Sequence, residues 1–168
     1  MIWRWSSAGW LLLAGAGLVG LATVLVWRRR STALASLLVV LAGAVTWSIC
    51  YALELTAGDL AGKRSWGDLK YVGICLLPPA YLAFVLVCSG RRAWPRWPGL
   101  LLVVEPVAVL ALLANDLTHD LVRYYPAEGA GTVPLMAEAG PLFWVHLAYT
   151  NLLIWAGTAV LVVTLGRM

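Results

Sequence analysis

Long apolar runs separated by short charged segments dominate this chain. Five runs are nearly free of Asp, Glu, Lys and Arg, and they cover about residues 10–27, 33–55, 69–89, 100–115 and 141–165. A helix needs about 20 apolar residues to cross roughly 30 Å of hydrocarbon. Only 12% of the residues are charged, against about 25% in soluble domains, which excludes a water-soluble protein. We therefore expect an all-α fold, a polytopic transmembrane helical bundle of about five spans that forms one domain over residues 1–168.

The basic residues predict how this bundle lies in the plasma membrane. The segments 28–32, 90–99 and 166–168 hold seven of the twelve Lys and Arg residues and no acid. Because basic loops remain on the cytoplasmic side, we expect the N-terminus outside and the C-terminus inside. The basic excess then favours contact with anionic lipids and does not indicate nucleic-acid binding. The first run precedes its arginines, which favours a retained anchor over a cleaved signal peptide.

Residues 116–140 form the longest segment between runs. They contain Pro126, Gly129, Gly131, Pro134 and Gly140, which are typical of turns. We expect a turn or a small hairpin here, placed outside the cell as a lid over the bundle.

Polar residues gather in the outer halves of the second and third runs. Trp47, Tyr51 and Glu54 recur at i, i+4 and i+7, which places them on one helical face. In the third run Lys70 lies at a similar depth. A Glu54–Lys70 ion pair would lower the cost of removing both charges from water. The sequence leaves open whether such a pair is structural or contacts a ligand.

The fifth run and the end of the fourth carry further polar groups. His146 follows Pro141 by about one and a half turns, and it is either a hydrogen-bonded histidine of the bundle or a ligand contact. Asn115 is equally consistent with a helix cap. The complete set of candidate ligand-binding residues is Trp47, Tyr51, Glu54, Trp66, Lys70, Tyr71, Asn115, His119, Trp144, His146, Tyr149 and Asn151.

Motifs that carry catalysis are missing from the sequence. It contains no G-x-x-x-x-G-K-[ST] phosphate loop, no H-E-x-x-H and no G-x-S-x-G. We therefore expect no catalytic residues, no enzyme activity and no cofactor on this chain. A metal site built on Asp116, His119, Asp120 and His146 is a weaker alternative, because the spacing permits it without being diagnostic.

Glu105 is the only acid expected in the inner half of the bundle. We expect it at the interface, or paired with an arginine of the loop 91–96. A transporter or channel subunit is the first alternative to a receptor, ahead of the metal site. It is less favoured than a receptor because no other charge continues the polar groups across the bilayer.

Four segments, taken in order, resemble the N-terminal seven-helix membrane region of sensor histidine kinases. They are 47–55, 66–73 with Pro78, 115–119, and 140–149 with Gly157. The resemblance matches Trp47, Glu54, Trp66, Tyr71, Gly73, Pro78, Asn115, His119, Trp144, His146 and Tyr149. It departs from the family in showing five runs where the family has seven, and in lacking a phosphoacceptor histidine box and ATP-binding glycine motifs. Kinase activity is therefore not assigned to this chain.

The resemblance implies a signal-input module of a two-component system. Its expected partners are an unknown small ligand or membrane cue, membrane lipids, and a cytoplasmic effector such as a histidine kinase, PAS or cyclase domain on further sequence or on a partner chain. A homodimer is a further expected arrangement, and no nucleic acid is expected.

Overall fold

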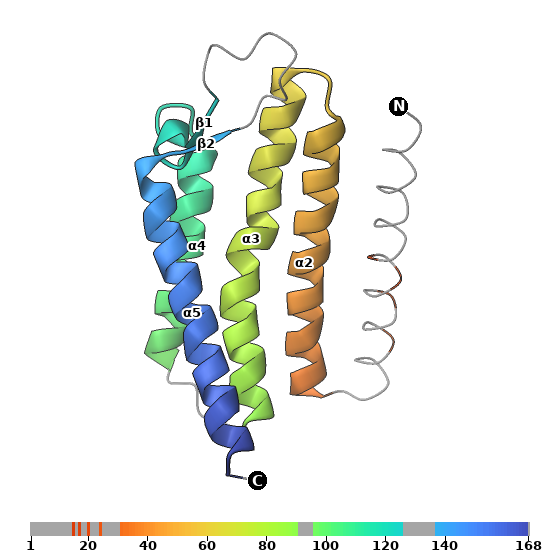
Figure 1. Ribbon diagram of the computed structural model, residues 1–168, viewed down its shortest axis with the longest axis vertical. Coiled ribbons are helices and arrows are strands. Elements are labelled where there is room, and N and C mark those ends of the chain that lie inside the picture. Colours follow the sequence, from red (N-terminus) through yellow and green to blue (C-terminus); the bar gives the residue numbers. More distant parts are fainter. Residues whose placement is uncertain are drawn as a thin grey trace.

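The computed structural model describes residues 31–90, 96–125 and 137–167, together with the isolated positions 15, 17, 20 and 24. Within these residues the chain is mainly helical, as predicted. The long helices α2 (Thr32–Thr56), α3 (Leu60–Cys88), α4 (Arg96–Leu113) and α5 (Pro141–Leu165) run along the long axis of the molecule (Figure 1). By length and composition, α2, α3 and α5 are able to cross a membrane, and α4 has a shorter apolar part at Leu102–Leu113. The predicted first run, 10–27, lies almost wholly outside the described residues, so the count of five spans stays a prediction.

Helix α3 begins nine residues before the predicted run, at Leu60. The Asp59 side chain caps it by accepting a hydrogen bond from the Gly62 amide at 3.3 Å. The first turns contain charged residues, so hydropathy alone misses them although the backbone is already helical. The helix then continues through Pro78 and Pro79.

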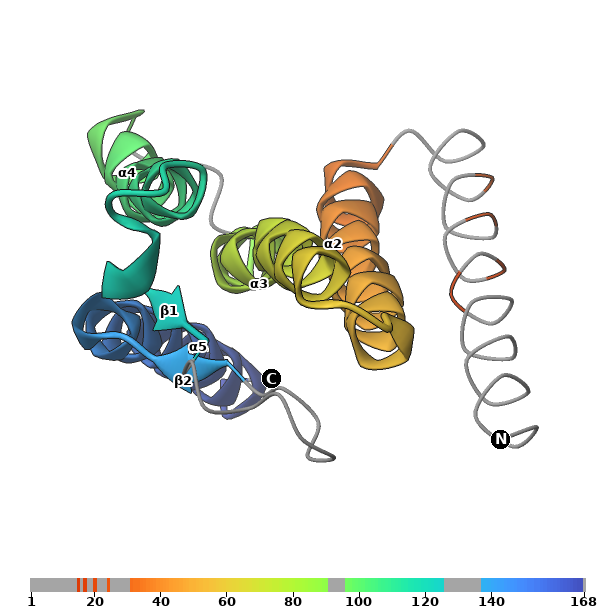
Figure 2. The same cartoon turned by 90° about the horizontal axis from the view of Figure 1, so that it is seen from above.

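Helices α2 and α3 pack side by side through two glycines. A Cβ atom built on Gly73 would lie 2.6 Å from the Trp47 amide nitrogen and would overlap the carbonyl oxygen of Gly43. Small residues permit this close backbone approach in membrane bundles. Seen along the bundle, α4 and α5 lie on the opposite side of α3 from α2 (Figure 2).

The segment after α4 forms the predicted small hairpin. A short 3-10 helix, η1 (His119–Leu121), leads into β1 (Arg123–Tyr124), which pairs antiparallel with β2 (Glu138–Ala139). The Gly140 amide donates a hydrogen bond to the Val122 carbonyl at 2.9 Å. We call this end of the molecule, with η1, β1, β2, the end of α2 and the start of α3, the hairpin end.

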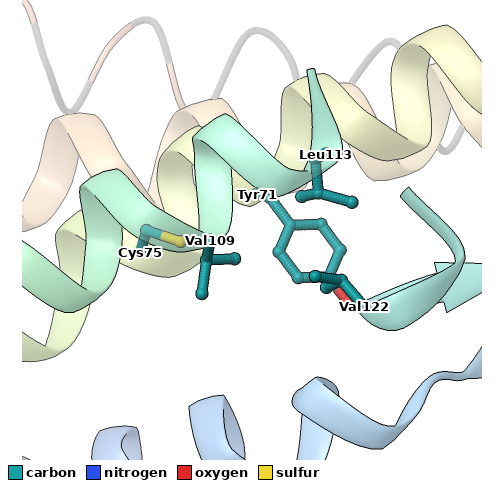
Figure 3. Close-up of a cluster of buried hydrophobic side chains, with 5 residues drawn as sticks. All are labelled: Tyr71, Cys75, Val109, Leu113 and Val122. Carbon is teal, nitrogen blue, oxygen red and sulfur yellow. The ribbon is translucent and has the colours of Figure 1, made fainter. Parts of the chain in front are cut away.

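A small core holds the hairpin end to the helices. Buried side chains from α3, α4 and the residue after η1 meet there, namely Tyr71, Cys75, Val109, Leu113 and Val122 (Figure 3). Val122, directly before β1, is fully buried. The core therefore fixes the position of the strand that follows it.

The Gly43–Gly73 contact predicts the effect of a single methyl group. Gly73→Ala forces α2 and α3 apart, because the added carbon meets backbone atoms that have no room to move. We expect the free energy of unfolding to fall by about 1–3 kcal/mol, the usual cost of overpacking. Thermal unfolding of the purified protein in detergent measures it. Gly58→Ala is the matched control, since a Cβ there meets no atom within 4 Å; equal stability of the two variants would contradict the proposed packing.

Candidate functional site

A network of buried charges at the hairpin end centres on Glu54 of α2. Its Oε1 accepts a hydrogen bond from Nη2 of Arg123 at 2.9 Å, and its Oε2 is ion-paired with Nζ of Lys70. The predicted Glu54–Lys70 pair is thus present. Glu54 and Arg123 are both buried, and their pairing offsets the cost of removing each charge from water. One carboxylate therefore joins α2, α3 and β1.

Arg123 fits into this network because α3 has a glycine beside it. A Cβ atom on Gly67 would lie within 2.5 Å of Nη2 of Arg123 and would overlap Nη1. The guanidinium carbon lies 5.8 Å from the centroid of the Tyr71 ring and 5.0 Å from that of Tyr125. Such distances are typical of cation–π contacts. Arginine, glycine and two aromatic rings thus form one packed unit.

Tyr125 adds a neutral donor to the network. Its hydroxyl oxygen lies 3.1 Å from the Lys63 carbonyl oxygen and 3.4 Å from Oε1 of Glu54, so its single proton is donated to one of these two acceptors. Burial raises the pKa of Tyr125 to about 12, so the hydroxyl keeps its proton over the physiological range.

A second acid, Asp68 of α3, lies next to this network. Its Oδ1 is 2.9 Å from Nε2 of His119, which is 1% exposed, and 3.7 Å from Nη1 of Arg123. Farther out, Arg64 and Asp116 pair at 2.6 Å in an exposed position. Arg123 therefore lies between the buried Glu54 and the partly buried Asp68.

The network forms one side of a cavity of about 400 Å³, a volume within the range of small-molecule sites. Four aromatic side chains and two cations line it, from α2, α3, the hairpin and α5. The lining residues are Trp47, Tyr51, Lys70, Tyr71, Ile74, Arg123, Ala137, Glu138, Ala139 and Phe143.

Four of the predicted ligand-binding residues line this cavity: Trp47, Tyr51, Lys70 and Tyr71. Glu54 and His119 do not line the cavity. Glu54 pairs with Arg123, and His119 pairs with Asp68. Trp66, on α3, is partly buried and is not among the lining residues.

The other predicted residues lie elsewhere. Asn115 accepts a hydrogen bond from the Leu117 amide at 3.0 Å, and Nδ2 of Asn151 donates to the Leu147 carbonyl at 2.7 Å. Trp144 is 62% exposed. None of these three side chains lines the cavity. For Trp144 and Asn151, apolar residues surround α5 on every face, so its sequence does not indicate which face meets its neighbours.

Glu105 has a histidine as its partner, and the arginine side chains of the loop 91–96 lie outside the described part of the structure. It pairs with no arginine in the described part of the chain; its Oε1 lies 2.7 Å from Nδ1 of the buried His146 on α5. Nearby, the Tyr149 hydroxyl donates to the Leu102 carbonyl at 2.7 Å. Glu105 is eight residues, about 12 Å, below the end of α4. It therefore lies near the middle of that helix, and its depth in the membrane stays a prediction.

The two histidines occupy separate pairs, His119 with Asp68 and His146 with Glu105. Among residues 31–90, 96–125 and 137–167, no three His, Cys, Asp or Glu side chains come together as a metal site requires. The geometry thus does not bring together the four residues of the metal alternative.

Sequence reasoning missed Arg123, Tyr125 and Phe143 as parts of the site. A weak signal was present for Arg123: it stands between apolar Leu121 and Val122 and two tyrosines, in a segment whose other charges are acidic. A lone cation in such surroundings indicates a buried partner.

Removing Arg123 tests how much the network stabilises the fold. Arg123→Gln leaves Asp68 and Glu54 short of one cation, and breaking a buried pair costs about 3 kcal/mol or more. Arg64→Gln is the control, because Arg64 is 40% exposed, pairs with the 89% exposed Asp116 and reaches Asp68 only at 4.0 Å, and an exposed pair contributes at most about 1 kcal/mol. Thermal unfolding in detergent compares them, and equal losses would count against a central role for Arg123.

The chain matches no curated protein and no solved structure. The family described as the N-terminal 7TM region of histidine kinase matches residues 11–168, nearly the whole chain. That match covers all of the helices, the hairpin and the cavity described above. The chain therefore belongs to the family of N-terminal seven-transmembrane regions of histidine kinases, the membrane sensor class that its residues resemble.

Proposed function

We propose that this chain is the signal-input module of a histidine-kinase-type system and binds a small ligand in the cavity at the hairpin end. The observation that carries the proposal is that the cavity and the Glu54 network share the residues Lys70 and Arg123. A ligand on that wall meets the same side chains that hold α2, α3 and β1 together.

Every element around the cavity contributes to its lining. Trp47 comes from α2, Lys70 from α3, Glu138 from β2 and Phe143 from α5. The affinity for a ligand then depends on how these elements are packed. A ligand that binds one packing tenfold more tightly shifts the population tenfold, equivalent to about 1.4 kcal/mol.

Two features support a relay toward the cytoplasm. Tyr71 lines the cavity, and its ring centroid lies 6.1 Å from that of His146, which is paired with Glu105 of α4. Helix α5 then continues from Phe143 beside the cavity to its end at Leu165, just before Arg167. The positive-inside distribution supports a cytoplasmic position for that basic end and a position outside the plasma membrane for the hairpin end. A cytoplasmic effector beyond α5 would receive the change.

A fusion to a cytoplasmic kinase domain tests this function. Trp47→Ala removes an aromatic wall of the cavity, so we expect the steady autophosphorylation of the fusion to change about tenfold, as a shift of 1.4 kcal/mol in packing requires. Trp155→Ala is the control, because this side chain is 73% exposed on α5 and is not part of the cavity. Membrane insertion is measured in parallel. If the Trp47→Ala fusion inserts correctly and its autophosphorylation equals that of the unmodified fusion, the proposal is wrong.

A further inference from the structure

We propose that the cavity takes a small organic anion, a carboxylate carried on an apolar body, and that Lys70 binds the carboxylate. This inference rests on the proposed function and names the chemical class of its ligand.

The ionisable groups of the cavity wall favour negative charge. Lys70 and Arg123 line the cavity, whereas Glu54, which pairs with both, does not. Arg123 is also 3.7 Å from Asp68, but within the lining itself the two cations Lys70 and Arg123 face one acid, Glu138. The ammonium of Lys70 has three N–H donors, and Oε2 of Glu54 accepts one of them. A ligand carboxylate on the cavity side supplies a second acceptor in a charge-assisted hydrogen bond.

Lys70 is better placed than Arg123 to meet a ligand. The Lys70 side chain is 16% exposed, against 3% for Arg123. Arg123 is also held by Glu54, by the tyrosine rings and by its contact with Gly67. Arg123 therefore acts as a positioning residue that keeps the cavity lining in place, and Lys70 is the residue that contacts the ligand carboxylate.

A cationic ligand does not fit the same wall. Aromatic faces attract cations, and a cavity with four aromatic residues invites that reading. The protein's own cations already occupy two of these rings: Nζ of Lys70 lies 5.2 Å from the centroid of Tyr51, and the Arg123 guanidinium lies 5.8 Å from that of Tyr71. A ligand ammonium there would meet like charge.

The remaining lining determines the body of the ligand. Trp47, Ile74 and Phe143 present apolar surface, which favours a hydrocarbon or aromatic group. The acid of the lining, Glu138, is exposed, and its carboxylate accepts a hydrogen bond from the Tyr124 hydroxyl. Since the exposed hairpin forms this side of the cavity, we expect the ligand to arrive from water.

Three probes with one carbon skeleton test the charge class: 3-phenylpropionate, 3-phenylpropionamide and 3-phenylpropylamine. The full chain is placed in nanodiscs of zwitterionic lipid, and binding is titrated by ligand-observed NMR, with empty nanodiscs subtracted. We expect the carboxylate to bind at least about tenfold more tightly than the amide, which corresponds to 1.4 kcal/mol, and the amine to bind most weakly.

Two lysine variants assign the preference to a residue. Lys70→Gln should bring the carboxylate to the affinity of the amide. Lys63→Gln should keep the preference, because Lys63 donates to the Glu54 carbonyl at 3.3 Å and does not line the cavity. The comparison of head groups in the unmodified chain needs no variant, so it stands even if Lys70→Gln fails to fold.

The outcomes separate this inference from the sensor function. Equal binding of carboxylate and amide, or no binding of the carboxylate, overturns the anion class, while the kinase output of Trp47→Ala still decides the sensor function. A carboxylate preference that survives Lys70→Gln overturns the role of Lys70. A preference lost in Lys70→Gln and kept in Lys63→Gln supports the inference.

Discussion

The Glu54 carboxylate, shared by Lys70 and Arg123, is the interaction on which the hairpin end depends. In a bundle this apolar, a charge persists inside only if it is paired. Each partner of Glu54 comes from a different element, so satisfying one acid also fixes the register of α2 against α3 and the position of β1. The cavity exists because these three elements are held at that spacing, with Phe143 of α5 closing another side.

Glycines set the distances that make this pairing work. Gly73 lets α2 approach α3 until backbone atoms nearly touch, and Gly67 leaves room for the Arg123 guanidinium against the helix. Without the second glycine, the guanidinium would be displaced from the line between Glu54 and Asp68. The small residues on α3 therefore have two effects: they permit close helix packing, and they leave room for the charged side chains beside them.

Sequence reasoning predicted the helical class, the extents of α2 and α5, the hairpin and the Glu54–Lys70 pair, because those features follow from hydropathy, turn residues and helical spacing. It missed Arg123 because residues in an irregular segment have no period that reports their direction. It missed the partner of Glu105 because counting along one helix does not reveal which residue of another helix lies beside it. His146 supplied that partner only once α4 and α5 were placed in space.

The position of Tyr71 joins the two polar parts of the bundle. One side of this residue lines the cavity beside Arg123, and its ring also lies near His146, while the side chain belongs to the core with Val109 and Leu113 of α4. Among the described residues, the Glu105–His146 pair leaves Oε2 of Glu105 and Nε2 of His146 buried without a hydrogen-bond partner. Incompletely satisfied buried groups reduce the stability of a packing arrangement. A change in the tilt of Tyr71 would therefore act on the contact between α4 and α5 where these two unpaired atoms lie.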